Sequence, residues 1–458
     1  VRQPMGVAGI IVPWNSPIIL TIRSLAPALA AGCAVIIKVP GKSAQIAATL
    51  SKIFANITEL PRGVINVFTD ETGEGAKHLV ASPEVPVISF TGSTATGKAI
   101  ALSAAPHFKR IGLELGGKTP SIVFDDTDLD LALPILAMSV TMFAGQFCVT
   151  GQRIIVQEGI ADEFKKRFAE RLRAVKVGPA ADLSSDMGPM IDRENVERVD
   201  KVVERAIAEG AEVIVRGGPI TDGPLSKGAF FRPTFLEVTD PTMQVVQEET
   251  FGPVVTMQRF TTEKEAVAMA NDSIYGLGAS IWTRDISKAL RIAPRIEAGL
   301  VWINEWGAVG EDTEEGGSKH SGLGRLNGVT AIDDYQIDFN EVAGVMQFTV
   351  TNVTNPAANP MPGVTGVPYE AGKTVSFGGV SLQMNGVPAT GDQIVLEQAQ
   401  QTDIFSVVRN AVDALRYTGA NNSAHRTQEL ARSLTELDAG HDRVLLARGR
   451  AGEWLNRA

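Results

Sequence analysis

Cys148 carries the side chain best suited to covalent chemistry in this sequence. It is one of two cysteines among 458 residues, and it lies in the mostly apolar stretch 143–153, which has glycines on both sides of it. A thiolate is a strong nucleophile, whereas an unreactive free cysteine usually packs as a small hydrophobic residue. The local sequence leaves both interpretations open, and a nucleophile would need partners from elsewhere in the chain.

Three polar residues that follow predicted strands could be such partners. Asn15, Lys38 and Glu114 each come directly after a short apolar run of the kind that forms a buried strand. In a parallel α/β sheet, ligands bind beyond the carboxyl ends of the strands, where these side chains are expected. Taken singly, they could equally be a turn asparagine, a solvated lysine and an exposed turn glutamate. Their common position at strand ends favours a shared site.

The segment 91–98 has the pattern of an anion site. Its sequence, Thr-Gly-Ser-Thr-Ala-Thr-Gly-Lys, joins a predicted strand, 85–90, to a predicted helix that ends near Ala104. Backbone N–H groups at a helix N-terminus can hold a pyrophosphate, and Gly92 would let the backbone approach it closely. Because the spacing is not Gly-x-Gly-x-x-Gly, a plain turn capped by Ser93 or Thr94 explains the segment equally well.

A second candidate segment is 247–254, in which an acidic residue and an aromatic residue stand two positions apart before Gly-Pro. Residues two apart in an extended segment project to the same side. We therefore expect Glu249 and Phe251 to face one site together.

These residues require a framework of alternating strands and helices. Helices are predicted at 23–31, at 45–58, after Lys98 to about Ala104, in a long segment that ends at Met142, and at 162–176, 193–209, 263–271 and 285–297. Strands are predicted at 6–12, 34–37, 64–68, 85–90, 110–113, 121–124, 153–157, 213–216, 278–282 and 300–304. Such alternation is typical of an α/β protein with a parallel sheet. Cys148 then lies in the loop that follows the fourth predicted helix.

Composition limits the class of protein. A chain of this length with 44% hydrophobic residues can form several buried cores, and two cysteines cannot make a disulfide framework, which suits the cytoplasm. The net charge of −10 argues against nucleic acid as a partner, and no apolar run is long enough for a membrane span. The five histidines lack metal-ligand spacing and no Gly-x-Ser-x-Gly occurs, so we expect neither a metal site nor a serine hydrolase.

Taken together, the motifs resemble the NAD(P)-dependent aldehyde dehydrogenase superfamily over about residues 1–335. The matching segments are Pro13-Trp14-Asn15, Lys38, 90–94 with Gly97, 114–118, 145–148, 249–253 and 319–325. The resemblance implies an α/β fold with a Rossmann-type cofactor domain at 1–116, incomplete at its N-terminus, and an α/β catalytic domain at 117–336. It also implies a small aldehyde as substrate and a possible homo-oligomer.

The resemblance assigns roles to the matching residues. Cys148 would add to the aldehyde carbonyl, the Asn15 amide and the Cys148 N–H would hold the oxyanion, hydride would pass to the nicotinamide, and Glu114 would activate the water that hydrolyses the thioester. The cofactor-binding residues would be Trp14, Lys38, Gly92, Ser93, Glu249 and Phe251. Helix ends and the cofactor's charge would have to lower the pKa of Cys148 below about 8.5.

Three departures from the family pattern bear on these expectations. The segment after Lys38 offers Gly41 where NAD-preferring members usually have a glutamate, and Lys42 permits a phosphate contact, so the cofactor is NAD or NADP. Phe143 stands where many members carry asparagine; with Phe147 and Trp306 it could line an apolar tunnel. The family's N-terminal segment before the Pro-Trp-Asn strand is missing, so the core is expected to be truncated.

The composition changes after Tyr335, and residues 337–458 are expected to form a separate α+β tail. The stretches 345–352 and 373–397 alternate and contain turn dipeptides, which predicts β-hairpins, and amphipathic helices are predicted near 404–415 and from 424. Parts of this tail resemble the C-terminal region of flagellar hook-associated protein 3 and flagellins, which implies flagellar partners. The alternatives are a filament-associated protein with a degenerate enzyme core, a coiled-coil oligomerisation tail and an inert fusion.

Overall fold

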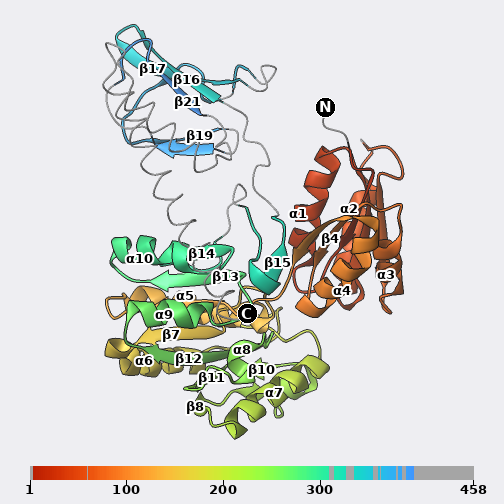
Figure 1. The fold of residues 1–458 in the computed structure, drawn as a ribbon, viewed down its shortest axis with the longest axis vertical. Coiled ribbons are helices and arrows are strands. Elements are labelled where there is room, and N and C mark those ends of the chain that lie inside the picture. Colours follow the sequence, from red (N-terminus) through yellow and green to blue (C-terminus); the bar gives the residue numbers. More distant parts are fainter. Residues whose placement is uncertain are drawn as a thin grey trace, which may run out of the picture. The chain divides into compact units, whose positions relative to one another are not determined.

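The chain divides into two compact units, residues 1–330 and 331–458, in the computed structural model shown in Figure 1. The structure describes residues 4–58, 60–308, 314–325, 335–353, 359–361, 363–377, 380–383 and 388–396. The first unit contains two largely parallel sheets, and the second contains antiparallel strands. All the residues predicted to form the site lie in the first unit.

The N-terminal sheet has the strand order β15-β5-β4-β1-β2-β3, and every neighbouring pair is parallel except β15 with β5. Its strands are β1 (Val7–Ile11), β2 (Ala34–Pro40), β3 (Ile65–Asp70), β4 (Val87–Thr91), β5 (Arg110–Glu114) and β15 (Gly322–Leu323). The helices are α1 (Pro17–Ala30), α2 (Ala44–Ala55), α3 (Glu74–Ala81) and α4 (Thr94–Ala104). The predicted alternation of strand and helix is therefore confirmed in this sheet.

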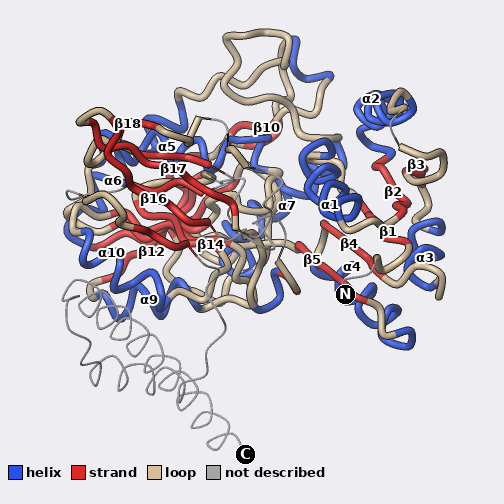
Figure 2. The backbone as a smooth tube through the Cα atoms, turned by 90° about the horizontal axis from the view of Figure 1, so that it is seen from above, coloured by secondary structure: helices blue, strands red, loops and turns tan. Residues whose placement is uncertain are grey.

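Helices cover both faces of this sheet. On one face, Leu25 of α1 and Ala47 of α2 pack in a core with strand residues such as Ile37. On the other face, Leu79 of α3 and Ile100 of α4 pack in a separate core. Figure 2 shows α1 and α2 on one side of the strands and α3 and α4 on the other. With both faces covered, ligands can reach this sheet at the ends of its strands.

The second sheet has the order β14-β13-β6-β7-β12-β11-β8 and is parallel except for β8. Its strands are β6 (Pro120–Val123), β7 (Arg153–Gln157), β8 (Glu212–Val215), β11 (Thr234–Glu237), β12 (Val254–Phe260), β13 (Gly278–Trp282) and β14 (Leu300–Ile303). Its helices are α5 (Leu129–Thr141), α6 (Ala161–Arg173), α7 (Arg193–Ala208), α8 (Gln244–Gln247), α9 (Glu263–Asn271) and α10 (Ile286–Ile292), and β9 (Gly218–Pro219) pairs with β10 (Phe231–Arg232). Neither β11 nor β12 was predicted from the sequence, although the two strands lie next to each other inside this sheet.

Several predicted boundaries in the N-terminal sheet were wrong, among them the end of the second helix, which is Ala55 rather than residue 58. Two of the differences concern the site. The first helix begins at Pro17 rather than at residue 23, because proline is favourable at the first position of a helix and Ser16 precedes it as N-cap. The second strand continues to Pro40, so Lys38 lies inside it and pairs in register with Ile11 and Phe68. Both differences matter for the site. Helix α1 begins only two residues after Asn15, and Lys38 is held within a strand.

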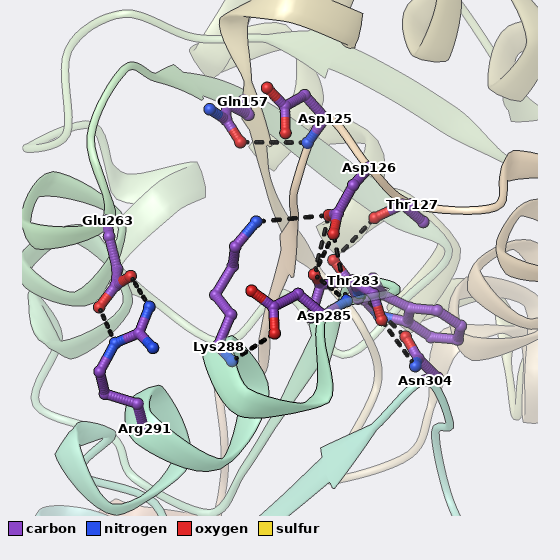
Figure 3. A network of polar contacts seen from close by, with 11 residues as sticks. Asp125, Asp126, Thr127, Gln157, Glu263, Thr283, Asp285, Lys288, Arg291 and Asn304 are labelled. Carbon is purple, nitrogen blue, oxygen red and sulfur yellow. Dashed lines mark hydrogen bonds and ion pairs between the residues drawn. The ribbon is translucent and has the colours of Figure 1, made fainter.

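A polar network ties together the strand ends of the second sheet (Figure 3). The Asp126 carboxylate, just after β6, accepts hydrogen bonds from Thr283 Oγ1 at 2.7 and 2.8 Å and from the Asp285 N–H at 3.2 Å. Asn304, just after β14, accepts a hydrogen bond from the Thr283 N–H and donates one to the Thr283 carbonyl. Burial raises the pKa of Asp126, but these hydrogen bonds and Lys288 outweigh it, so the net shift is downward.

We expect the Asp126→Asn variant to lower the free energy of unfolding by about 1–2 kcal/mol, because charge-assisted hydrogen bonds to Thr283 are replaced by neutral ones. The Asp125→Asn variant, with the same chemical change at the exposed neighbouring residue, should be close to neutral. Urea unfolding at neutral pH measures both. Because the pKa of Asp126 is lowered in the folded state, the difference in stability between the unmodified chain and Asp126→Asn should shrink as the pH falls through that pKa. Equal stability of the two variants at neutral pH would contradict the expectation.

The second unit contains an antiparallel sheet with the order β18-β17-β16-β21 and a separate pair, β19 and β20. The strands are β16 (Tyr335–Val342), β17 (Val345–Asn352), β18 (Val367–Pro368), β19 (Thr374–Phe377), β20 (Val380–Gln383) and β21 (Gln393–Leu396). The pairs β16–β17 and β19–β20 are antiparallel, as the hairpin prediction expects, and Ile337, Phe339, Phe348 and Val350 form a small core. The predicted turn at 385–386 and the helices predicted after residue 403 lie outside the described residues.

Within the described ranges, no helix is both long enough and apolar enough to cross a bilayer. The same ranges hold no group of three or more His, Cys, Asp or Glu side chains arranged to bind a metal ion.

Candidate active site

Cys148 lies in a sharply turned loop between α5 and β7. The loop passes through a 3-10 turn, Met142–Gly145, in which Phe143 and Ala144 have left-handed backbone angles with φ of 52° and 54°. A Cβ atom on Gly145 would lie 2.3 Å from the carbonyl carbon of Gly252, so only glycine fits there. Left-handed angles at non-glycine residues are costly and are held by the surrounding structure. The loop is therefore fixed by its packing against the 249–253 segment.

Asn15 contacts this loop directly. Its side-chain amide donates a hydrogen bond to the carbonyl of Gln146, at 3.1 Å. The amide has a second N–H, and the Cys148 backbone N–H has no acceptor among the described residues. The Asn15 amide thus lies against the loop that carries Cys148, and with the Cys148 backbone N–H it could donate to an oxyanion at an atom bonded to the sulfur.

Glu114 is the last residue of β5, and its side chain is buried, with 6% of its surface exposed. Its Oε1 atom is buried and has no hydrogen-bond partner among the described residues. Burial raises the pKa of Glu114 to about 7, while Arg23 and Arg325 lower it and Glu315 raises it further. A carboxyl group with this pKa can accept a proton near neutral pH and release it again.

A double glycine brings Glu249 and the cysteine loop to the end of β5. The Gly117 N–H donates a hydrogen bond to Glu249 Oε1 at 3.3 Å, and a Cβ atom on Gly116 would lie 2.3 Å from Glu249 Oε2. A Cβ atom on Gly117 would lie 2.6 Å from the Cys148 carbonyl oxygen. Any larger side chain at these two positions would separate the three segments, so the glycines assemble the site.

The charge environment of Cys148 does not favour its thiolate. Burial raises the pKa of Cys148 to about 12, and the neighbouring carboxylates of Glu249, Glu114 and Glu315 add to this, while Arg23 lowers it. The expected decrease, which was to come from helix ends and the cofactor's charge together, is not produced by the charged side chains of the protein alone. A further positive charge is needed to make the thiolate accessible.

The candidate cofactor-binding residues lie around the ends of β1, β2 and β4. Lys38 is half-buried, and its ammonium group has no partner among the described residues. The helix α4 begins right after Gly92, Ser93 caps it by accepting a hydrogen bond from the Thr96 N–H, and the N–H groups of its first two residues have no acceptor in the described part of the chain. A helix N-terminus with free N–H groups and no acidic residue in its first turn attracts phosphate.

Trp14 and Phe251 meet edge to face, with 5.6 Å between their ring centroids. Phe251 has a left-handed backbone with φ of 50°, and Arg198 of α7 fixes it by donating hydrogen bonds to the carbonyls of Thr250 and Phe251 at 2.9 and 3.2 Å. Two predicted cofactor residues that are distant in sequence are thus in contact. No sequence pattern indicated a role for Arg198, because it lies in a charged helix that is typical of solvated surface.

Lys42 has a carboxylate partner. Its ammonium group lies 2.6 Å from Asp192 Oδ2, at the N-terminus of α7. A lysine that is already paired is a poorer phosphate ligand than a free one. Lys42 therefore gives less reason to expect NADP as the cofactor.

The aromatic residues predicted near the thiol form a continuous ladder. Phe143 and Phe147 meet edge to face at 5.4 Å, and Phe147 and Trp306 do so at 6.0 Å. Trp306 is buried and donates a hydrogen bond to the Val149 carbonyl at 2.8 Å. These aromatic contacts therefore stabilise the cysteine loop on one side. The half-exposed Phe143 lies at the outer end of the row of rings.

Two charged residues of the site received no role from the sequence: Lys118, which lies in the matching segment 114–118, and Arg23, which lies in no matching segment. Lys118 is buried, donates hydrogen bonds to Gln152 and Thr250, and burial lowers its pKa to about 7. Arg23 of α1 is paired with Glu315, with 2.5 Å between Nη1 and Oε2. No local pattern marks them, because their partners are more than thirty positions away.

The comparisons with known proteins indicate one family. A model of the aldehyde dehydrogenase family matches residues 1–338. Betaine aldehyde dehydrogenase of Bacillus subtilis (strain 168) is 38% identical over 337 residues, which make up 73% of this chain and 68% of that enzyme. The family match ends near the start of the second unit, and the comparisons give no support to the flagellar interpretation of residues 340–458.

Three solved structures share the fold of the first unit. A Mycobacterium tuberculosis aldehyde dehydrogenase complexed with NAD+ has a TM-score of 0.68 at 38% identity, covering 71% of this chain and 67% of its own. HpcC from Thermus thermophilus has a TM-score of 0.69 at 40% identity, covering 72% and 64%. Betaine aldehyde dehydrogenase from Staphylococcus aureus in complex with NAD+ has a TM-score of 0.69 at 37% identity, covering 79% and 70%.

This chain thus spans about two thirds of the length of the relatives it matches. The family match includes every residue predicted to form the site, and the parallel sheets agree with the fold class inferred from the sequence. This chain therefore belongs to the aldehyde dehydrogenase family, whose members are NAD(P)-dependent oxidoreductases.

Proposed function

We propose that this chain oxidises a small aldehyde to its carboxylic acid with NAD or NADP as oxidant, through a covalent bond to Cys148. The observation that carries the proposal is Glu114: a buried carboxyl group with a pKa raised to about 7 and an unpartnered oxygen, coupled electrostatically to a thiol. Structural carboxylates are usually paired and have lowered pKa values. A raised pKa beside a nucleophile is typical of a general base.

The residues around the thiol support the covalent step. The Cys148 thiolate attacks the carbonyl carbon, a C–S bond forms, and the electron pair of the C=O bond moves to the oxygen. The second N–H of the Asn15 amide and the Cys148 backbone N–H would donate to this oxyanion. Glu114 would later take a proton from a water that attacks the acyl-cysteine, so that the acid leaves and the thiol is restored.

The chain's own groups fit a dinucleotide. Lys38 offers an unpaired cation among the described residues, the start of α4 at Ser93 offers free N–H groups beyond Gly92, and Trp14 with Phe251 offers aromatic surface. Glu249, held against Gly117, is a hydrogen-bond acceptor for ribose hydroxyls. When bound, a nicotinamide cofactor accepts the hydride of the aldehyde carbon, and its positive charge opposes the carboxylates that raise the pKa of Cys148.

We expect the full chain to reduce NAD or NADP in the presence of at least one aldehyde from a panel of aliphatic, aromatic and betaine aldehydes; the last is included because two relatives bear its name. The steady-state rate should increase with pH through about 7, because Glu114 must be ionised to act as a base. Absorbance of the reduced nicotinamide measures both. Absence of reduction with every aldehyde and both cofactors would overturn the proposal for this chain.

A further inference from the structure

An ion pair between Arg23 and Glu315 lies inside the site and has no part in the chemistry described above. The Arg23 side chain is 8% exposed and that of Glu315 is 16% exposed, with 2.5 Å between Nη1 and Oε2. Arg23 Nε is also buried and has no partner among the described residues. Enclosing two charges costs desolvation free energy that their attraction often fails to recover, so a buried ion pair is weak evidence for a role in stability.

The helix α1 and the strand β4 fix the guanidinium close to Glu114. Arg23 lies two turns into α1, and its Nη2 donates a hydrogen bond to Thr91 Oγ1 at 3.1 Å. Thr91 is the last residue of β4 and pairs in register with Glu114, the last residue of β5. The positive charge is therefore held at the carboxyl ends of the two strands that present the proposed base.

Glu315 is held as firmly from the other side. The glycines that follow it are tightly enclosed: a Cβ atom would lie 2.6 Å from the Gly324 carbonyl oxygen at position 316, and 2.4 Å from the Ser321 carbonyl carbon at position 317. The strand β15 of the same segment pairs with β5, with Gly322 opposite Glu114. The negative charge thus comes from a segment that is itself docked on the strand of the proposed base.

The pair acts on two ionisable groups at once. For Glu114, the effect of burial is opposed by Arg23 and Arg325 and reinforced by Glu315. For Cys148, burial and Glu249 disfavour the thiolate, Arg23 favours it, and Glu114 and Glu315 disfavour it. The two members of the pair therefore have opposite effects on both groups.

We propose that Arg23 and Glu315, paired beside the strand ends that carry Thr91 and Glu114, are positioning residues that set the reactivity of Cys148. Arg23 would act by its fixed positive charge, and Glu315 by holding and partly offsetting that charge. The inference rests on the proposed function, in which Cys148 is the nucleophile. It does not require either residue to touch the substrate. A purely mechanical alternative is that the pair only clasps α1 to the 314–325 segment.

The test is the rate at which the neutral reagent iodoacetamide alkylates Cys148 in the full chain, followed by mass spectrometry at one pH below the pKa of the thiol. Neither aldehyde nor cofactor is added, so a chain that lacks dehydrogenase activity can still be tested. Arg23→Met should slow alkylation roughly three- to tenfold and Glu315→Gln should accelerate it by a similar factor, as expected for one charge at short range in a partly buried site. The double variant should react at close to the unmodified rate.

Arg23→Lys keeps the charge and should restore most of the rate, and Arg205→Met removes an exposed arginine of α7 as the matched control. Cys33 is buried in the core of the first sheet, and its separate peptide reports any loosening of the fold. The clasp alternative predicts that both single variants shift the rate in the same direction and expose Cys33. That result, or unchanged rates in both single variants, would overturn the proposal.

Discussion

Replacing Cys148 with alanine is expected to abolish aldehyde-dependent reduction of NAD and NADP, by a factor on the order of 10⁴ or more. The covalent route requires the sulfur atom, and the chain's other thiol, Cys33, is buried in the core of the first sheet. The fold should persist, because the Cys148 side chain is half-buried and the loop is held by Thr150 Oγ1, which donates to the Phe147 carbonyl at 2.6 Å.

The matched control is Cys33→Ala, which removes the chain's other thiol. Cys33 is 5% exposed in a core with Val35 and Leu25, so the variant should lose about 1 kcal/mol of stability and retain activity. Circular dichroism and the steady-state rate distinguish the two variants. If Cys148→Ala retained turnover, or if Cys33→Ala lost it at full stability, the nucleophile would be misassigned.

Much of the site could be predicted because its residues are tied to strand ends. Asn15, Gly92 and Glu114 follow apolar runs, and parallel strands bring their carboxyl ends to one edge of a sheet. Short-range patterns are enough for this, since each strand and its following turn are consecutive in the chain. The roles of these residues stay proposals, but their assembly in one place follows from the topology.

The parts that could not be predicted depend on contacts between distant segments. The Arg23–Glu315 pair spans 292 positions, and the Lys118–Thr250 hydrogen bond spans 132. Neither residue type nor spacing distinguishes these side chains from the solvated charges that the sequence also contains. The left-handed backbone at Phe143 could not be predicted from the sequence either, because it occurs at a residue that rarely adopts this conformation, in a loop that packs against Gly252 through Gly145.

At Cys148, burial and neighbouring carboxylates outweigh the groups that would lower the pKa of the thiol. A helix end or a nearby cation lowers a thiol's pKa, but an enclosed site with three carboxylates raises it. Under the proposed function, the Cys148 thiol would therefore stay protonated until the positive charge of the cofactor is added. A thiol held in this state is protected from oxidation, since the thiolate is the reactive form.

Replacing Glu114 with glutamine should separate the two halves of the reaction. The amide cannot take a proton from water, so hydrolysis of the acyl-cysteine should slow by roughly 10²–10⁴-fold, whereas the step that forms it does not need this base. We expect one burst of reduced cofactor per active chain, followed by slow turnover, and an increase in the mass of the Cys148 peptide equal to the acyl group. The increase of rate with pH through about 7 should disappear.

Glu249→Gln is the comparison that makes the assignment specific. Burial raises the pKa of Glu249 to about 7 as well, opposed by the Gly117 N–H and Lys118, so pH dependence alone cannot distinguish the two carboxyl groups. Glu249 accepts a hydrogen bond from Gly117, whereas Glu114 Oε1 has no partner in the described residues and is free to bind water. Glu249→Gln should therefore weaken cofactor binding, measured as a higher KM, without accumulating acyl-cysteine. Accumulation in Glu249→Gln and not in Glu114→Gln would transfer the role of base to Glu249.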